Sequence, residues 1–138
     1  MKISTKILIG LAGLVVLMQV IPLERDNPPE GQAFAGPAEV EAILARACYD
    51  CHSNRTSWPW YSYVAPISFL VVHDVHEGRE ALNFSDWEGG PVVAAEILEE
   101  VSGRDMPLGI YLPLHPEAAV SPADIEVLRG FFATNPAD

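Results

Sequence analysis

The sequence predicts an all-α fold of short helices joined by proline-rich loops. Apolar residues recur at steps of three and four over residues 40–51 and again over residues 67–75, which is the period of an amphipathic helix. Residues 121–124 are Ser-Pro-Ala-Asp and combine a helix cap, a first-turn proline and a capping-box acid. The 12 prolines and 10 glycines among 138 residues favour short elements and argue against large sheets. A chain of this length forms one domain with a modest core.

The expected helices follow one another from residue 37 onward. Pro37 suits the first position of a helix, whose apolar stripe continues to residue 51. Residues 53–66 are dense in aromatic residues and proline, so they are expected to pack as a loop. Further helices are predicted over residues 66–81 and 92–102, with Gly103 ending the latter. Residues 104–116 contain three prolines and are predicted to run as an extended loop before the last helix.

The pentapeptide Cys48-Tyr49-Asp50-Cys51-His52 closes the first of these helices. A C-x-x-C-H run is the attachment signature of c-type haem, in which two thiols form thioethers with the porphyrin and the histidine binds the iron. On a helix, residues i and i+3 share a face, so Cys48 and Cys51 reach one porphyrin edge while His52 projects beneath the ring. The sequence therefore predicts one covalent haem c, held by Cys48, Cys51 and His52.

Three other interpretations of this motif are a thioredoxin-like redox pair, half of a zinc site and a chance match. A thioredoxin motif belongs in a βαβ pattern, and a structural zinc site needs about four ligands, usually with a second pair of cysteines or histidines. The sequence supplies neither context, and Cys48 and Cys51 are its only cysteines. A chance match is the risk that any short motif carries.

Met106 is the predicted sixth ligand of the iron. It lies far enough beyond the motif for two helices to form before the chain returns over the open face of the porphyrin. Pro107 stops a helix there, and Gly103 and Gly109 let the segment bend across the ring. A thioether ligand also raises the reduction potential, as an electron carrier requires. His115 is the rival ligand because imidazole binds iron well, although it would equally serve to bind a propionate or to cap a turn.

The net charge of −11 is unevenly distributed along the chain. Both lysines, Lys2 and Lys6, precede an apolar leader, whereas residues 24–138 hold all 19 Asp and Glu against six Arg, a balance of −13. Such a surface repels nucleic acid and steers basic proteins toward it. We expect a redox partner with a basic docking surface and no nucleic-acid ligand.

Residues 7–23 form an uncharged apolar run that predicts an N-terminal transmembrane helix. At ~1.5 Å per residue the run spans ~25 Å, near the lower limit for a ~30 Å hydrocarbon layer. The sequence Pro22-Leu23-Glu24-Arg25 is a poor cleavage site, which favours an uncleaved anchor over a cleaved export signal. Lysines before the run and acids after it place the following domain outside. The predicted organisation is an anchor at residues 1–23, a linker at 24–36 and a c-type haem-binding domain at 37–138.

Short motifs accompany the C-x-x-C-H run over residues 22–132. They are Arg25-Asp26-Asn27-Pro28-Pro29, Ser53-Asn54 with Thr56, Trp58-Pro59-Trp60-Tyr61, Glu77-Gly78-Arg79, Asn83-Phe84-Ser85 with Trp87, Met106-Pro107, Tyr111 and His115-Pro116-Glu117-Ala118. Together they resemble the membrane-anchored bacterial haem-binding domain proteins, which are relatives of monohaem class I cytochromes c. The resemblance implies a small cytochrome c-like all-α fold in the periplasm. It also supports Met106 as an iron ligand.

The leading hypothesis is a monohaem c-type cytochrome that carries single electrons at the outer face of the bacterial inner membrane and is not an enzyme. The second is a haem sensor or peroxidase-like enzyme with an open sixth iron position and His73, His76 or His115 as a distal base. The third is a tethered haem subunit of a respiratory complex, in which the haem relays electrons within a larger assembly.

Overall fold

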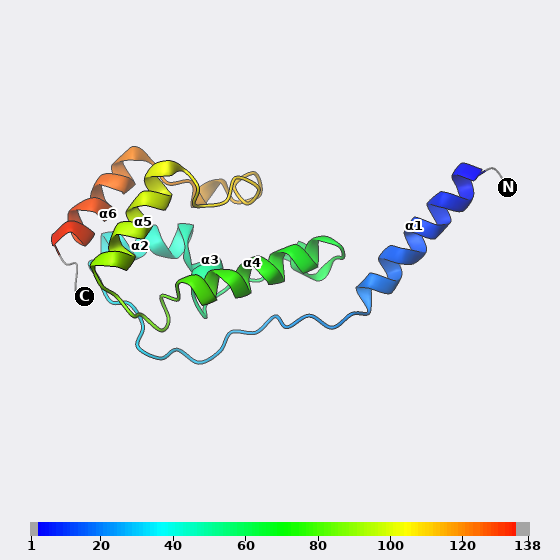
Figure 1. The fold of residues 1–138 in the computed structure, drawn as a ribbon, viewed down its shortest axis with the longest axis horizontal. Coiled ribbons are helices and arrows are strands. Elements are labelled where there is room, and N and C mark those ends of the chain that lie inside the picture. Colours follow the sequence, from blue (N-terminus) through cyan, green and yellow to red (C-terminus); the bar gives the residue numbers. More distant parts are fainter. Residues whose placement is uncertain (1–2, 135–138) are drawn as a thin grey trace.

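The computed structural model describes residues 3–134, and within them the regular structure is entirely helical (Figure 1). The elements are α1 (Ile3–Gln19), α2 (Ala38–Ala47), α3 (Tyr49–His52), the 3-10 helix η1 (Trp60–Tyr63), α4 (Ile67–Ala81), α5 (Pro91–Gly103), the 3-10 helix η2 (Pro116–Ala118) and α6 (Pro122–Thr134). The all-α prediction is therefore confirmed for these residues. Lys2, and residues 135–138 of the expected haem domain, lie outside them.

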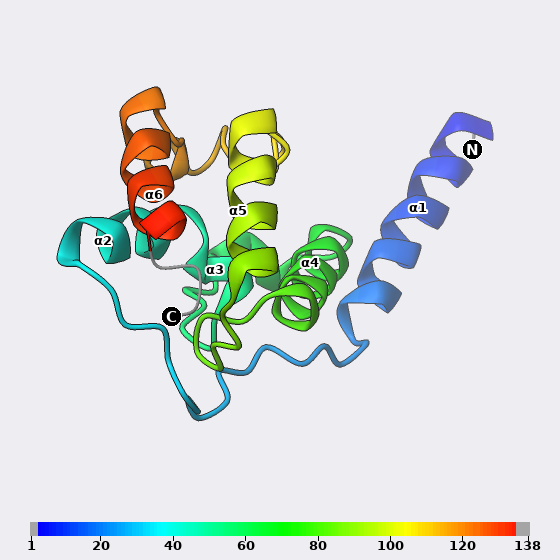
Figure 2. The same cartoon turned by 60° about the vertical axis from the view of Figure 1, so that its left-hand side comes forward.

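The main core lies where α2, α5 and α6 meet. Helix α6 packs against both α2 and α5, and Figure 2 shows α5 and α6 side by side above α2 and α3. The residues that these helices bury are Val40, Ile43 and Leu44 from α2, Ala94, Ile97 and Val101 from α5, and Leu128 and Phe132 from α6. Leu44 and Leu128 are fully buried, and each such side chain stabilises the fold by roughly 1.5–3 kcal/mol.

The start of α6 has the cap that the sequence predicts. The Ser121 backbone N–H donates to Asp124 Oδ2 over 2.7 Å, and the Asp124 N–H donates back to Ser121 Oγ over 3.2 Å. Arg46 of α2 forms an ion pair with the same carboxylate over 2.7 Å. This reciprocal cap therefore fixes the start of α6 and also ties it to α2.

The predicted transmembrane helix is wrong. Helix α1 has 17 residues, about 25 Å of helix at ~1.5 Å per residue, against the ~30 Å that a bilayer core requires. Among residues 3–134 we find no helix that is both long and apolar enough to cross a membrane. The helix ends earlier than expected because Pro22 lacks an amide hydrogen and disfavours helical geometry in the residue before it. Val20 and Ile21 accordingly lie beyond the end of α1.

Residues 24–36, the expected linker, have no regular secondary structure and run along the domain. The backbone N–H of Phe34 donates to the Phe84 carbonyl over 2.7 Å, and that of Gly31 donates to the Ser85 carbonyl over 2.9 Å. The Phe34 ring is buried in the core and makes edge-to-face contacts with Phe84 and Trp87. This segment therefore contributes a core side chain to the folded domain.

Candidate functional site

The C-x-x-C-H pentapeptide spans the junction between α2 and α3. Cys48 caps the end of α2 with φ −124° and ψ −37°, and α3 begins at the next residue. Helical hydrogen bonds nevertheless continue across the junction, from the Cys48 N–H to the Leu44 carbonyl and from the His52 N–H to the Cys48 carbonyl, both 2.8 Å. The two cysteines are therefore one turn apart, as expected, although α2 itself does not extend through the motif.

Both cysteines are free thiols in a poorly solvated environment. Burial, together with the neighbouring Cys51, raises the pKa of Cys48 to about 12. Burial, together with the carboxylates of Asp50 and Asp74, raises the pKa of Cys51 to about 11. Both side chains are therefore protonated thiols at neutral pH, which is the form that adds S–H across a vinyl group.

His52 is fixed through its backbone and its ring. Its carbonyl accepts a 2.8 Å hydrogen bond from the Phe84 N–H, and its Nδ1 lies 3.1 Å from the Leu82 carbonyl just beyond α4. Because a carbonyl only accepts, this bond requires a proton on Nδ1 and leaves Nε2 as the nitrogen available to bind a metal. This is the tautomer that an iron-binding histidine needs, with its orientation set by a backbone acceptor.

Gly78 permits α4 to pack closely against the motif. A Cβ atom at this position would lie 2.6 Å from the Cys51 carbonyl oxygen and 3.1 Å from its carbonyl carbon. Both are backbone atoms, so no side-chain rotation would relieve the overlap. The close approach explains the glycine in Glu77-Gly78-Arg79 and holds α3 against α4.

Arg79 connects the segment before the domain, the loop after the motif and α4. Its Nε donates to the Ser53 carbonyl over 2.8 Å, and its Nη2 donates to Thr56 Oγ1 over 2.8 Å and to Asn27 Oδ1 over 3.0 Å. Asp26 supplies a further backbone acceptor and a carboxylate 3.6 Å away. The planar guanidinium thus donates to several acceptors at once, which the ammonium group of a lysine could not do with the same geometry.

Residues 104–115, here called the strap, connect α5 to η2 as a series of turns. Met106 is half-buried in it and lines a cavity of about 150 Å³. The other lining residues are Val101 of α5, Arg104, Pro107 and Leu112 of the strap, and Ala119 and Val120 after η2. His115 lies at the other end, where its Nε2 meets the Tyr61 hydroxyl at 2.6 Å and its Nδ1 meets Glu117 Oε1 at 3.2 Å. The structure thus brings Cys48, Cys51 and His52 together and places Met106 on a separate segment.

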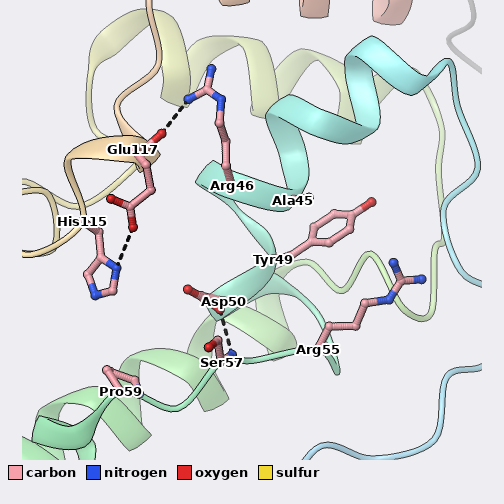
Figure 3. Close-up of a pocket in the computed structure, with 9 residues that line it drawn as sticks. All are labelled: Ala45, Arg46, Tyr49, Asp50, Arg55, Ser57, Pro59, His115 and Glu117. Atoms are coloured by element: carbon pink, nitrogen blue, oxygen red, sulfur yellow. Dashed lines mark hydrogen bonds and ion pairs between the residues drawn. The ribbon is translucent and has the colours of Figure 1, made fainter.

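A cavity of about 520 Å³ lies beside the motif (Figure 3). Its lining residues are Ala45, Arg46, Tyr49, Asp50, Arg55, Ser57, Pro59, His115 and Glu117. Tyr49 and Asp50, the two residues between the cysteines, line this cavity. The cysteines and His52 are not among its lining residues. In Figure 3, Glu117 lies between Arg46 and His115, and Asp50 accepts a hydrogen bond from the Ser57 N–H.

Sequence reasoning assigned no role to Asp50 or Tyr111. The Tyr111 hydroxyl donates to Asp50 Oδ2 over 2.7 Å, and this bond joins the strap to the motif. Burial and this hydrogen bond both raise the pKa of Tyr111 above its usual value. The sequence offers no direct signal for the contact, because the two residues are 61 positions apart.

In a comparison with protein families, residues 13–134 match a model described as a haem-binding domain. This match covers most of the chain, so the protein belongs to the haem-binding domain family and is a haem protein. No curated protein and no solved structure matches it. The relationship to cytochromes c, the covalent attachment and the number of haems stay predictions.

The residues around the motif suit a haem. They offer two free thiols one turn apart and an imidazole whose Nδ1 is bound to a backbone carbonyl, which leaves Nε2 for the iron. Trp58, in the loop that follows the motif, has a buried indole N–H without an acceptor among the described residues. A haem carboxylate is an acceptor of the right chemistry for such a donor, since a buried unpaired N–H is costly.

Proposed function

We propose that this haem protein is a monohaem c-type cytochrome that carries single electrons. The observation that supports it most strongly is geometric: two free thiols lie one helical turn apart, next to a histidine whose Nδ1 is already bound by the Leu82 carbonyl. The haem supplies the redox-active iron, so the protein needs no nucleophile or general base for this function.

In this proposal, each residue of the site has a separate role. Cys48 and Cys51 hold the haem through two thioethers, and His52 binds the iron through Nε2. Met106 provides the sixth ligand from the strap. The Leu82 carbonyl and the contact at Gly78 keep the histidine and the motif in place. A saturated iron coordination shell of this kind favours electron transfer over ligand chemistry.

A haem sensor or peroxidase-like enzyme is the second candidate. One observation favours it: His115 lines the cavity of about 520 Å³ beside the motif, together with Arg46 and Arg55. An open iron position near such a cavity would allow a small ligand to bind and a distal histidine to move a proton.

For the carrier, we propose a location in the periplasm and a redox partner with a basic docking surface. The excess of acidic over basic residues in residues 24–138 supports electrostatic steering of such a partner. The rate of electron transfer between this partner and the protein should fall as the salt concentration rises, because the Debye screening length shortens to ~8 Å near physiological ionic strength. A rate that is independent of salt would contradict the steering.

Visible spectra of the haem-loaded protein distinguish the carrier from the sensor or enzyme. The carrier predicts a six-coordinate low-spin iron in both redox states and a weak long-wavelength absorption band from a sulfur-to-ferric-iron transition. Met106→Ala should abolish that band, lower the potential and open the iron to carbon monoxide. Met18→Ala, in α1, is the matched control and should change none of them.

If Met106→Ala left all three properties unchanged and His115→Ala altered them, His115 would be the ligand. A high-spin iron that binds carbon monoxide readily in the wild-type protein would contradict the carrier and support the second candidate.

A further inference from the structure

The strap is joined to the haem-attachment motif by a hydrogen bond between two side chains. The Tyr111 hydroxyl donates to Asp50 Oδ2 over 2.7 Å. Asp50 lies between the two cysteines, within the α3 helix of four residues. A movement of the strap that breaks this bond would therefore take place beside Cys48 and Cys51, the residues that would hold the haem.

Asp50 is held firmly in the orientation that receives Tyr111. Its other carboxylate oxygen accepts a 2.8 Å hydrogen bond from the Ser57 N–H, and its backbone carbonyl accepts one from Thr56 Oγ1, also 2.8 Å. The loop after the motif thus fixes the acceptor, and little side-chain entropy is lost when Tyr111 binds to it.

Tyr111 is held firmly as well. Its ring stacks on the His115 ring, with centroids 4.0 Å apart and an angle of 5° between the planes. His115 in turn meets the buried Tyr61 hydroxyl at 2.6 Å. The strap is therefore attached at its C-terminal half both to α3, through Tyr111, and to η1, through His115.

Within the strap, local turns shape the chain but do not attach it to the motif. The N–H groups of Tyr111, Leu114 and His115 donate to carbonyls three residues earlier. At the other end, the N–H of Met106 donates to the Glu100 carbonyl over 3.3 Å at the end of α5. Between its contact with the end of α5 and its contact with η1, the strap is held to the motif by the Tyr111–Asp50 bond, which therefore opposes movement of the strap away from the motif.

We propose that the Tyr111–Asp50 hydrogen bond latches the strap onto the attachment motif and limits the access of competing ligands to the iron. The proposal rests on the function proposed above, in which Met106 of the strap occupies the sixth iron position. A hydrogen bond to a carboxylate acceptor should lower the population of molecules with an open strap by roughly 10- to 100-fold. Loss of the bond should increase the affinity for a competing ligand by a similar factor.

Imidazole binding to the ferric, haem-loaded full-length protein tests the latch. Tyr111→Phe removes the hydroxyl and keeps the ring that stacks on His115, so we expect imidazole to bind about tenfold more tightly or better. Asp50→Asn keeps a neutral acceptor and should give a smaller increase. Tyr63→Phe is the matched control, because Tyr63 is half exposed on η1, and it should bind imidazole as the wild type does.

Hydrogen exchange of the strap amides gives a second readout that does not depend on the iron ligand. Tyr111→Phe should accelerate exchange at residues 108–115, and adding Asp50→Asn to this variant should cause no further change, because the two residues act through one bond. Unchanged exchange in Tyr111→Phe, or additive effects in the double variant, would overturn the latch.

The same two measurements separate failure of the latch from failure of the proposed function. If Met106→Ala binds imidazole no better than the wild type, the ligand assignment fails and exchange alone decides whether the latch exists. If Met106→Ala binds imidazole more tightly but Tyr111→Phe does not, the ligand assignment holds and the latch does not control access.

Discussion

Gly78→Ala should destabilise the protein, although alanine is the better residue in a helix. Gly78 lies inside α4, where the substitution by itself would add about 0.5–1 kcal/mol of stability. The new Cβ would instead meet the Cys51 carbonyl oxygen at 2.6 Å. Overpacking of this kind costs about 1–3 kcal/mol, so we expect the free energy of unfolding to fall.

Gly130→Ala in α6 is the control for this prediction. An added Cβ there would meet no atom within 4 Å, so this variant should gain the roughly 0.5–1 kcal/mol of the better helix former. Urea unfolding of the haem-loaded proteins, followed by circular dichroism, measures both changes. If Gly78→Ala were as stable as Gly130→Ala, the close contact between α3 and α4 would be wrong.

Two further substitutions test the packing of the domain. Phe34→Ala should lower the free energy of unfolding by about 3–5 kcal/mol, because it removes a ring that is 5 % exposed, whereas Val92→Ala, at an exposed position of α5, should change it by less than about 0.5 kcal/mol. Equal effects of the two would contradict the placement of residues 24–36. Asp124→Asn should cost about 1 kcal/mol at pH 7, because the bonds to Ser121 and Arg46 hold the pKa of Asp124 at about 2. The lowered pKa stabilises the protein above pH ~4 and this contribution is lost as the pH falls toward ~2, so the two unfolding curves should converge over that interval. A difference as large at pH 2 as at pH 7 would argue against the ionised cap.

The helices of the domain follow from local sequence patterns. The apolar stripe of residues 40–44 and the cap at residues 121–124 specify α2 and the start of α6, and the structure contains both. The same reasoning placed the end of the first helix too late, because it counted an apolar run up to residue 23 without the effect of Pro22 on the residues before it.

The contacts that organise the site depend on residues far apart in the sequence. Phe34 lies in a segment without periodicity and is buried only because Phe84 and Trp87 approach it from elsewhere in the chain. The pairing of Tyr111 with Asp50 likewise requires the strap to return to the motif. The roles of the cysteines and His52 could be predicted from the sequence because neighbouring residues form a recognisable motif, whereas the contacts of Phe34 and Tyr111 depend on tertiary structure.

The mass of the intact, denatured polypeptide tests the central claim most directly. Two thioethers at Cys48 and Cys51 predict that the protein purified from cells with a haem-attachment system is heavier than the bare chain by one haem. The variant with serine at both positions should have the mass of the bare chain. A wild-type protein without added mass, or a double variant that retains denaturation-resistant haem, would contradict covalent attachment at this motif.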